Sequence, residues 1–197
     1  MLPPGPIALA VGLAVLLAAT RVPDAEAAAL AAAIRDGDRG AFRRFFDATH
    51  ADLLRSIQRR GLSPDAAEDV AQQAYVWIWE HRDRIDPERP LRGLLYRIGV
   101  TRGLNSLRDN GRLDPLPDRE MEAPQASDAA EAAELRAALA AAVAALPERR
   151  RQTFELCFVD GLTHREAGEV MGVSHRTVEH QMAHALGAVR EALARFL

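Results

Sequence analysis

The chain has 197 residues, of which 48% are hydrophobic and 27% charged, a composition that excludes disorder throughout. Its net charge of −3 excludes a protein that coats nucleic acid indiscriminately, and its single cysteine excludes an internal disulfide and a multi-cysteine zinc site. Aromatic residues make up only 5% and alanine is abundant, so we expect an all-α protein.

Residues 1–23 form an N-terminal extension of uncertain role. Its uncharged run, residues 7–20, is shorter than the roughly 20 residues that a membrane-spanning helix needs. No Lys or Arg precedes the run, although a signal peptide requires one. An extension, a signal and a start codon assigned too far upstream all stay open. We expect a cytoplasmic protein.

Two helices are predicted before Gly61. Asp24 is the N-cap candidate of the first, which ends at Gly37, and Asp38 can cap the second. Apolar residues of the second recur three and four positions apart, and this face should lie in the core. They are Phe42, Phe45, Phe46, Leu53, Leu54 and Ile57.

A third helix opens with Ser63 as N-cap and Pro64 in its first turn. The stripe predicted to be buried is Ala67, Val70, Ala71, Ala74 and Ile78. The polar residues on its other face are Asp69, Gln72 and Gln73. Two prolines then interrupt the chain, and a fourth helix is predicted over residues 91–108.

Charge is segregated around residue 112. Residues 89–112 contain six arginines and one acid, whereas residues 113–134 contain seven acids and one arginine. We predict that residues 113–127 are an acidic linker between a domain over residues 24–112 and a second over residues 128–197.

The second domain is also predicted to be helical. Ser127 or Asp128 can cap an alanine-rich helix that ends at Leu146, and Pro147 starts the next. Further on, the stretch "GLTHREAGEVMGVSHRTVEH" predicts two helices joined by a turn. Glu166 stands three positions after Thr163, as in a capping box. The predicted turn is at Gly172 and Val173.

Ser174 can cap the last helix. The side predicted to be buried is Val178, Met182, Leu186 and Val189. This helix-turn-helix pattern fits DNA binding in a major groove, and it also fits two helices that merely pack together.

Histidines near this turn raise the question of a metal. His180 and His184 stand one turn apart, and His175 is near. No glutamate lies between the pair as in a zinc protease, and no third close ligand completes a site, so we expect no metal and no other cofactor.

Several motifs match one family in order and spacing: "GDRGAF", "AEDVAQ", "LPERRRQTF" and "TVEHQMAHAL". Residues 28–197 resemble the group IV, extracytoplasmic-function sigma factors of the sigma-70 family, which serve bacterial RNA polymerase. The C-terminal motifs are similar to those of the iron-citrate-type branch, whose members are usually controlled by a membrane-bound anti-sigma factor.

The resemblance implies a non-enzymatic factor that binds core RNA polymerase, recognises promoter DNA and promotes melting, without a small-molecule substrate. It assigns polymerase binding to Asp69, Gln72 and Gln73. It assigns the minus-ten element to Arg92, Tyr96, Arg97, Thr101, Arg102, Asn105, Arg108 and Arg112. It assigns the minus-thirty-five element to Arg149, Arg150, Ser174, His175, Arg176, Thr177, Glu179 and His180.

The minus-ten segment departs from the family pattern at Leu94, Thr101, Asn105 and Ser106. These departures motivate an alternative, a helix-turn-helix regulator or a degenerate sigma-like adaptor without promoter opening. Two interpretations of the acidic linker also stay open, a solvated spacer and a mimic of nucleic acid in the polymerase channels.

Overall fold

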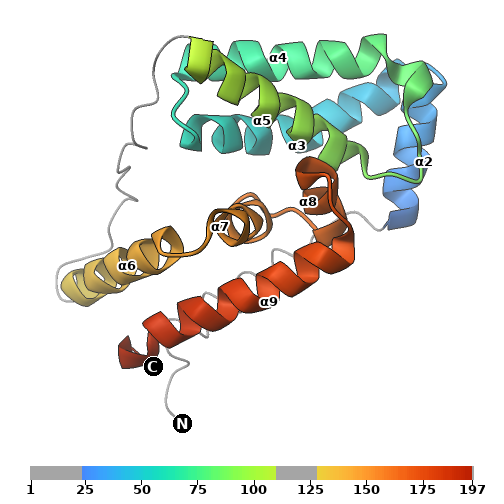
Figure 1. The fold of residues 1–197 in the computed structure, drawn as a ribbon. Coiled ribbons are helices and arrows are strands. Elements are labelled where there is room, and N and C mark those ends of the chain that lie inside the picture. The colour runs from blue at the N-terminus through green and yellow to red at the C-terminus, as the bar shows by residue number, and fades with distance from the viewer. Residues whose placement is uncertain (1–23, 110–127, 197) are drawn as a thin grey trace. The chain divides into compact units, whose positions relative to one another are not determined.

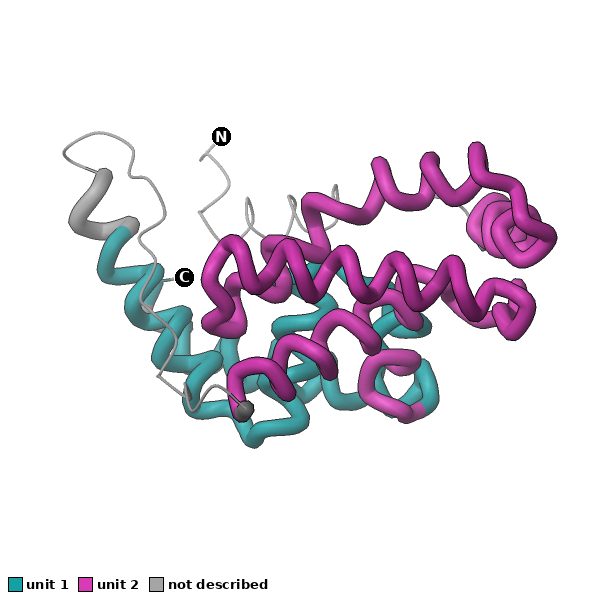
Figure 2. The backbone as a smooth tube through the Cα atoms, turned by 90° about the horizontal axis from the view of Figure 1, so that it is seen from above, with its two compact units in different colours: residues 1–21, 119–167, 174–197 teal, residues 22–118, 168–173 magenta. Residues whose placement is uncertain are grey.

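The computed structural model describes residues 24–109 and 128–196 (Figure 1). Every regular element in this part of the chain is a helix, which confirms the predicted all-α class. None of these helices is both long enough and apolar enough to cross a lipid bilayer. The chain divides into two compact units, coloured separately in Figure 2.

The N-terminal unit, magenta in Figure 2, is built mainly from four α-helices and a short 3-10 turn. They are α2 (Asp24–Arg35), α3 (Arg39–Arg59), α4 (Pro64–Glu80), η1 (Arg82–Arg84) and α5 (Leu91–Asp109). Helices α3, α4 and α5 pack against one another, and α2 packs against α3. The core side chains include Ile34, Phe45, Leu53, Ile57, Ile78 and Leu95.

Local signals set the starts of these helices. The Asp38 carboxylate accepts hydrogen bonds from the backbone N–H groups of Gly40 and Ala41, and the Ser63 hydroxyl accepts one from Ala66. Both predicted caps are therefore confirmed, whereas Asp24 lies inside α2 rather than before it. The predicted α4 stripe is confirmed, because all five of its residues are buried.

The C-terminal unit, teal in Figure 2, contains α6 (Asp128–Ala144), α7 (Glu148–Phe154), a π-helical turn η2 (Glu155–Val159), α9 (His175–Ala192) and a 3-10 turn η3 (Ala194–Phe196). Helices α6 and α7 both pack on α9. Their shared core is Leu146, Phe154, Met182, Ala185, Val189 and Leu193. Helix α8 (His164–Met171) precedes α9 in the chain.

The buried side of α9 differs from the prediction at one position. Leu186 is 39% exposed, and Ala185 is fully buried in its place. A helix turns about 100° per residue, so Ala185 lies about 40° and Leu186 about 60° from the mean direction of the buried residues Val178, Met182 and Val189. The direction in which a side chain points from α9 therefore decides its burial here, and the larger size of Leu186 does not.

Candidate protein and nucleic-acid interfaces

The outward side of α4 presents a polar stripe. Asp69, Gln72 and Gln73 are all exposed, and their spacing places them on one side of the helix. Val76, one turn further along, is 47% exposed. Hydrogen-bonding groups beside an exposed apolar side chain suit the docking of another protein.

An open groove adjoins this stripe. Its lining residues are Phe42, Phe46, His50, Glu68, Gln72, Tyr75, Val76, Trp79 and Glu80, from α3 and α4. The rings of Phe42 and Trp79 have centroids 5.0 Å apart, and those of Phe46 and Tyr75 are 4.7 Å apart. These packed rings give the groove apolar walls, and its two glutamates add negative charge.

Tyr75 is the buried member of this aromatic cluster. Its hydroxyl lies 2.7 Å from the Thr49 hydroxyl, which donates a hydrogen bond to the carbonyl oxygen of Phe45. Burial raises the pKa of the Tyr75 phenol well above its ordinary value, and this outweighs the lowering effect of the Thr49 hydrogen bond. Tyr75 is therefore a neutral hydrogen-bonding group at physiological pH.

The outward side of α5 carries a different chemistry. Thr101, Asn105 and Arg108 are exposed at helical spacing, and Leu104 beside them is 49% exposed. A hydroxyl, an amide, a cation and an exposed apolar group can together hold single-stranded nucleic acid through its backbone and its bases.

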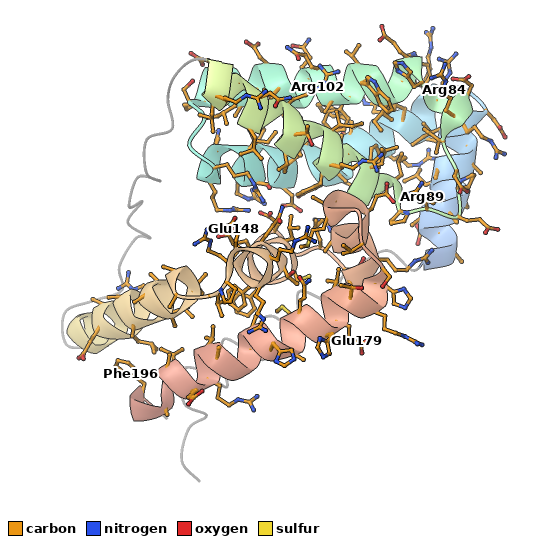
Figure 3. All side chains as sticks on the ribbon, in the orientation of Figure 1. Arg84, Arg89, Arg102, Glu148, Glu179 and Phe196 are labelled. Carbon is orange, nitrogen blue, oxygen red and sulfur yellow. The ribbon has the colours of Figure 1, made fainter. Side chains whose placement is uncertain are left out.

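The other predicted α5 cations occupy varied positions. Arg97 is partly exposed. Arg102, labelled in Figure 3, donates a 2.9 Å hydrogen bond from Nη1 to Oε1 of Gln73 on α4. This bond connects a residue predicted to contact the minus-ten element with one predicted to contact polymerase. Arg112 lies outside the described residues.

Two glycines on the inner side of α5 hold this helix close to its neighbours. A Cβ atom on Gly99 would lie 3.0 Å from Cδ1 of Leu53, and one on Gly103 would lie 3.5 Å from Cδ1 of Leu62. The absence of side chains thus permits the close packing that fixes which side of α5 faces outward.

Tyr96 requires a correction. We predicted that it meets DNA bases, but its side chain is completely buried in the core. Arg92 is also held against the protein, with its guanidinium 5.2 Å from the Tyr96 ring centroid and Nη2 3.5 Å from Oδ2 of Asp52. Both residues lie on the inner side of the helix, so they support the surface instead of forming it.

The third candidate surface is the N-terminal part of α9. The residues predicted here are all exposed: Ser174, His175, Arg176, Thr177, Glu179 and His180. Glu179 is labelled on α9 in Figure 3. The Ser174 hydroxyl accepts a 3.1 Å hydrogen bond from the Thr177 backbone N–H and forms the predicted N-cap.

The segment before α9 follows its predicted local structure. The Thr163 N–H donates to the Glu166 carboxylate at 2.7 Å, and the Glu166 N–H donates to the Thr163 hydroxyl at 3.1 Å, which confirms the capping box. Gly172 adopts a φ of +67°, a left-handed conformation that favours glycine, at the predicted turn.

Helix α7 supplies the remaining predicted contacts. Arg149 is exposed and Arg150 is partly exposed. The Thr153 hydroxyl lies 2.8 Å from the Arg149 carbonyl oxygen and 2.7 Å from Oε1 of Gln181 on α9. This polar contact adds to the apolar core in fixing α7 against α9.

Two family models match these elements in chain order. Residues 45–113 match sigma-70 region 2, and residues 136–189 match sigma-70 region 4. The chain is an extracytoplasmic-function sigma factor of the sigma-70 family. The α4 and α5 surfaces of this sigma factor therefore fall within region 2, and α7 and α9 within region 4.

Individual relatives agree with this assignment. The sigma factor is 29% identical over 173 residues to the extracytoplasmic-function sigma factor RpoE of Cereibacter sphaeroides, with 84% of this chain and 94% of the relative covered. It is also 29% identical over 173 residues to the RNA polymerase sigma factor CnrH of Cupriavidus metallidurans, with 79% and 88% covered.

Solved structures give the same fold. A structure of CnrH in complex with the cytosolic domain of CnrY matches with a TM-score of 0.56 and 27% identity, covering 86% of this chain and 97% of the other. The sigma factor RpoE in complex with the anti-sigma factor NepR from Bartonella quintana matches with a TM-score of 0.53, 17% identity, and 78% and 96% covered. Assignment to the iron-citrate-type branch stays a prediction.

Two exposed apolar residues of this sigma factor were not predicted from its sequence. Val76 and Leu104 lie within the α4 and α5 surfaces. Val76 stands outside the predicted buried stripe of its helix, and this position was the available signal. His184 was noticed for its spacing but given no role. Its four-residue separation from His180 was the available signal.

Proposed function

We propose that this sigma factor docks on core RNA polymerase through the α4 stripe and the adjoining groove. Asp69, Gln72 and Gln73 supply hydrogen-bonding groups, while Val76 and the aromatic walls supply apolar contact. The observation that supports this role is the exposed side chain of Val76 between polar residues on an otherwise well-packed helix.

The outward side of α5 is the proposed minus-ten surface. Arg97, Arg102 and Arg108 supply cations for the single-stranded backbone, and Thr101 and Asn105 can meet bases that have left the stack. The hydrogen bond from Arg102 to Gln73 supports a proposed melting surface directly beside the proposed polymerase surface. Arg112 belongs to the same proposal from its sequence position.

Helix α9 is the proposed minus-thirty-five reader. Its exposed first turns can enter a major groove about 12 Å wide, with side chains at the base edges. Arg149 and Arg150 of α7 are proposed backbone contacts. The domain limits, 24–112 and 128–197, and the linker between them remain part of this proposal.

An anti-sigma factor is the proposed negative regulator. The matching structures of CnrH and Bartonella RpoE contain CnrY and the anti-sigma factor NepR, respectively. We propose a comparable partner for this chain, a cytoplasmic location, and no catalytic centre or cofactor of its own in initiation. Nucleotide addition is then the work of core polymerase.

Transcription with purified components tests the proposal. Core polymerase, the full chain and a DNA fragment from upstream of its own gene should yield a run-off transcript and permanganate-reactive thymines. Replacing Asp69 and Gln72 together with alanine should weaken polymerase binding at least about tenfold, as for truncation of central interface residues. Polymerase binding without melting on a genomic fragment pool would instead support a degenerate adaptor.

Arg44→Ala provides the matched control for polymerase binding. Arg44 is exposed on α3, and its position two residues after Phe42 places it about 200° around the helix from the groove. Its replacement should leave polymerase binding unchanged.

A double variant, Arg97→Ala with Arg102→Ala, should lose promoter melting while most polymerase binding is retained. Unchanged melting in that double variant would support the plain regulator.

A further inference from the structure

His180 and His184 form a close pair on the exposed side of α9. Their Nε2 atoms lie 3.3 Å apart, and their ring centroids are separated by 4.5 Å with the planes at 71°. Both side chains are exposed. The two Nε2 atoms are therefore within hydrogen-bonding distance of each other.

The separation of the two nitrogens also fits a metal ion. Histidine nitrogens bind zinc at about 2.05 Å, and two such ligands on a tetrahedral ion lie about 3.3 Å apart. Two ligands at a right angle, as in octahedral or square-planar coordination, would lie about 2.9 Å apart at the same bond length. The observed pair matches the tetrahedral spacing.

The space around the pair is open to an ion. Gly187, three residues after His184, has no side chain, and a Cβ atom built there meets no atom within 4 Å. Ala183 beside the pair is small and exposed. In the described residues, no group of three or more His, Cys, Asp or Glu side chains forms a metal site, so the pair would supply two ligands.

We propose that His180 and His184 chelate a divalent transition metal ion, with zinc as the best geometric fit. Each ring then carries its proton on Nδ1 and gives its Nε2 lone pair to the ion, while water fills the two other positions. Such a site is open and exchangeable. The earlier expectation of no metal rested on the missing third protein ligand, whose position water takes in the proposed open site.

A bound ion would also change DNA recognition, and this part rests on the proposed function of α9. His180 is one of the proposed minus-thirty-five contacts, whereas His184 is not. Zinc bound to both rings removes the His180 nitrogen from base contact and places a hydrated ion on the surface that enters the groove. The site would therefore reduce promoter binding when zinc is available.

Zinc titration of the DNA-free, full-length protein tests the site itself. After treatment with a chelator, the wild type should bind one zinc ion per chain in competition with a chromogenic chelator. His180→Ala and His184→Ala should each weaken this binding at least about tenfold, because a single imidazole lacks the high effective concentration of a second ligand. His175→Ala, one helical turn or more away, should change it less than about twofold.

Two results would overturn the site. Binding that survives both single replacements would place zinc elsewhere on the chain. Equal loss in His175→Ala would show a different ligand set. Circular dichroism of each variant should match that of the wild type. In the wild type, zinc should shift the imidazole nitrogen NMR signals of His180 and His184 only. A purely structural defect in a variant would not produce this pattern.

A second measurement tests the effect on DNA. With holoenzyme and a promoter fragment, saturating zinc should weaken binding of the wild type but not of His184→Ala, which keeps every proposed DNA contact. Unchanged wild-type binding under saturating zinc would overturn the regulatory effect. If no promoter fragment binds even without zinc, the proposed function fails, while the titration still decides the metal site.

Discussion

At the scale of single residues, the neighbours of a position determine how a substitution there changes stability more than the residue type does. Gly99 and Gly187 are both glycines within helices, yet a side chain on Gly99 would meet Leu53 whereas one on Gly187 would meet open space. Mid-helix glycine costs about 1 kcal/mol relative to alanine. The cost at Gly99 is offset by close helix packing, and at Gly187 it is not.

Leucine at each of these glycines should therefore have opposite effects. Gly99→Leu should lower the free energy of unfolding by about 1–3 kcal/mol through overpacking against α3. Gly187→Leu should raise it by about 0.5–1 kcal/mol through helix propensity. Urea denaturation followed by circular dichroism measures both. A stabilised Gly99→Leu would contradict the close packing of α5.

Tyr75 gives a prediction about alkaline pH. Its folded-state pKa is raised by burial, so the unfolded chain releases the phenol proton at lower pH than the folded chain. Stability from this group is complete below the ordinary pKa of 10.0 and is lost as pH rises above it. The loss should approach about 1.4 kcal/mol per pH unit.

Urea melts at several values between pH 9 and pH 11 measure this effect. Tyr75→Phe has no phenol to ionise, so its stability should fall less steeply over this range than that of the wild type. Equal slopes for the two proteins would show that Tyr75 does not contribute to the alkaline loss.

At the scale of elements, caps fix where the helices begin. Ser174 begins α9 by accepting the Thr177 N–H, and it is also a proposed DNA contact. These two roles can be separated because asparagine and aspartate also cap helices well, but only aspartate adds negative charge.

Ser174→Ala should lower the free energy of unfolding by about 0.5–2 kcal/mol. Ser174→Asn and Ser174→Asp should keep most of the wild-type stability, because both side chains can cap the helix. Promoter binding should weaken in Ser174→Asp through repulsion from phosphate, and Ser174→Asn should stay near the wild type. Thermal melts and DNA binding at several salt concentrations measure the two roles. Equal promoter binding by the Asn and Asp variants would remove Ser174 from the DNA surface.

At the scale of the whole molecule, the proposal requires two domains that reach separate promoter elements while bound to one polymerase. The sequence-predicted linker, residues 113–127, lies outside the described residues. A flexible spacer affects binding only through the effective concentration of the second domain near its promoter element once the first is bound. This concentration falls roughly as the −3/2 power of the spacer length.

Doubling this linker with fifteen Gly and Ser residues should therefore reduce promoter affinity only about threefold. The same insertion before residue 24 should have no effect on promoter binding. Run-off transcription and promoter binding by holoenzyme measure the change. Complete loss of initiation, with polymerase binding intact, would favour the interpretation of the linker as a mimic of nucleic acid.

The sequence alone determined the features that depend on neighbouring residues. The caps at Ser63, Thr163 and Ser174 and the turn at Gly172 each involve atoms within a few positions along the chain, so residue types and spacing suffice to predict them. The family could also be predicted from the sequence, because each of its motifs is a contiguous stretch of the chain.

Only the tertiary structure decided which side chains face the core and which meet one another. It buried Tyr96, exposed Leu186, and joined Arg102 to Gln73 across two helices. It also set the distance between the Nε2 atoms of His180 and His184. These properties depend on the packing directions of helices far apart in the chain and on side-chain rotamers, which residue order and periodicity do not specify.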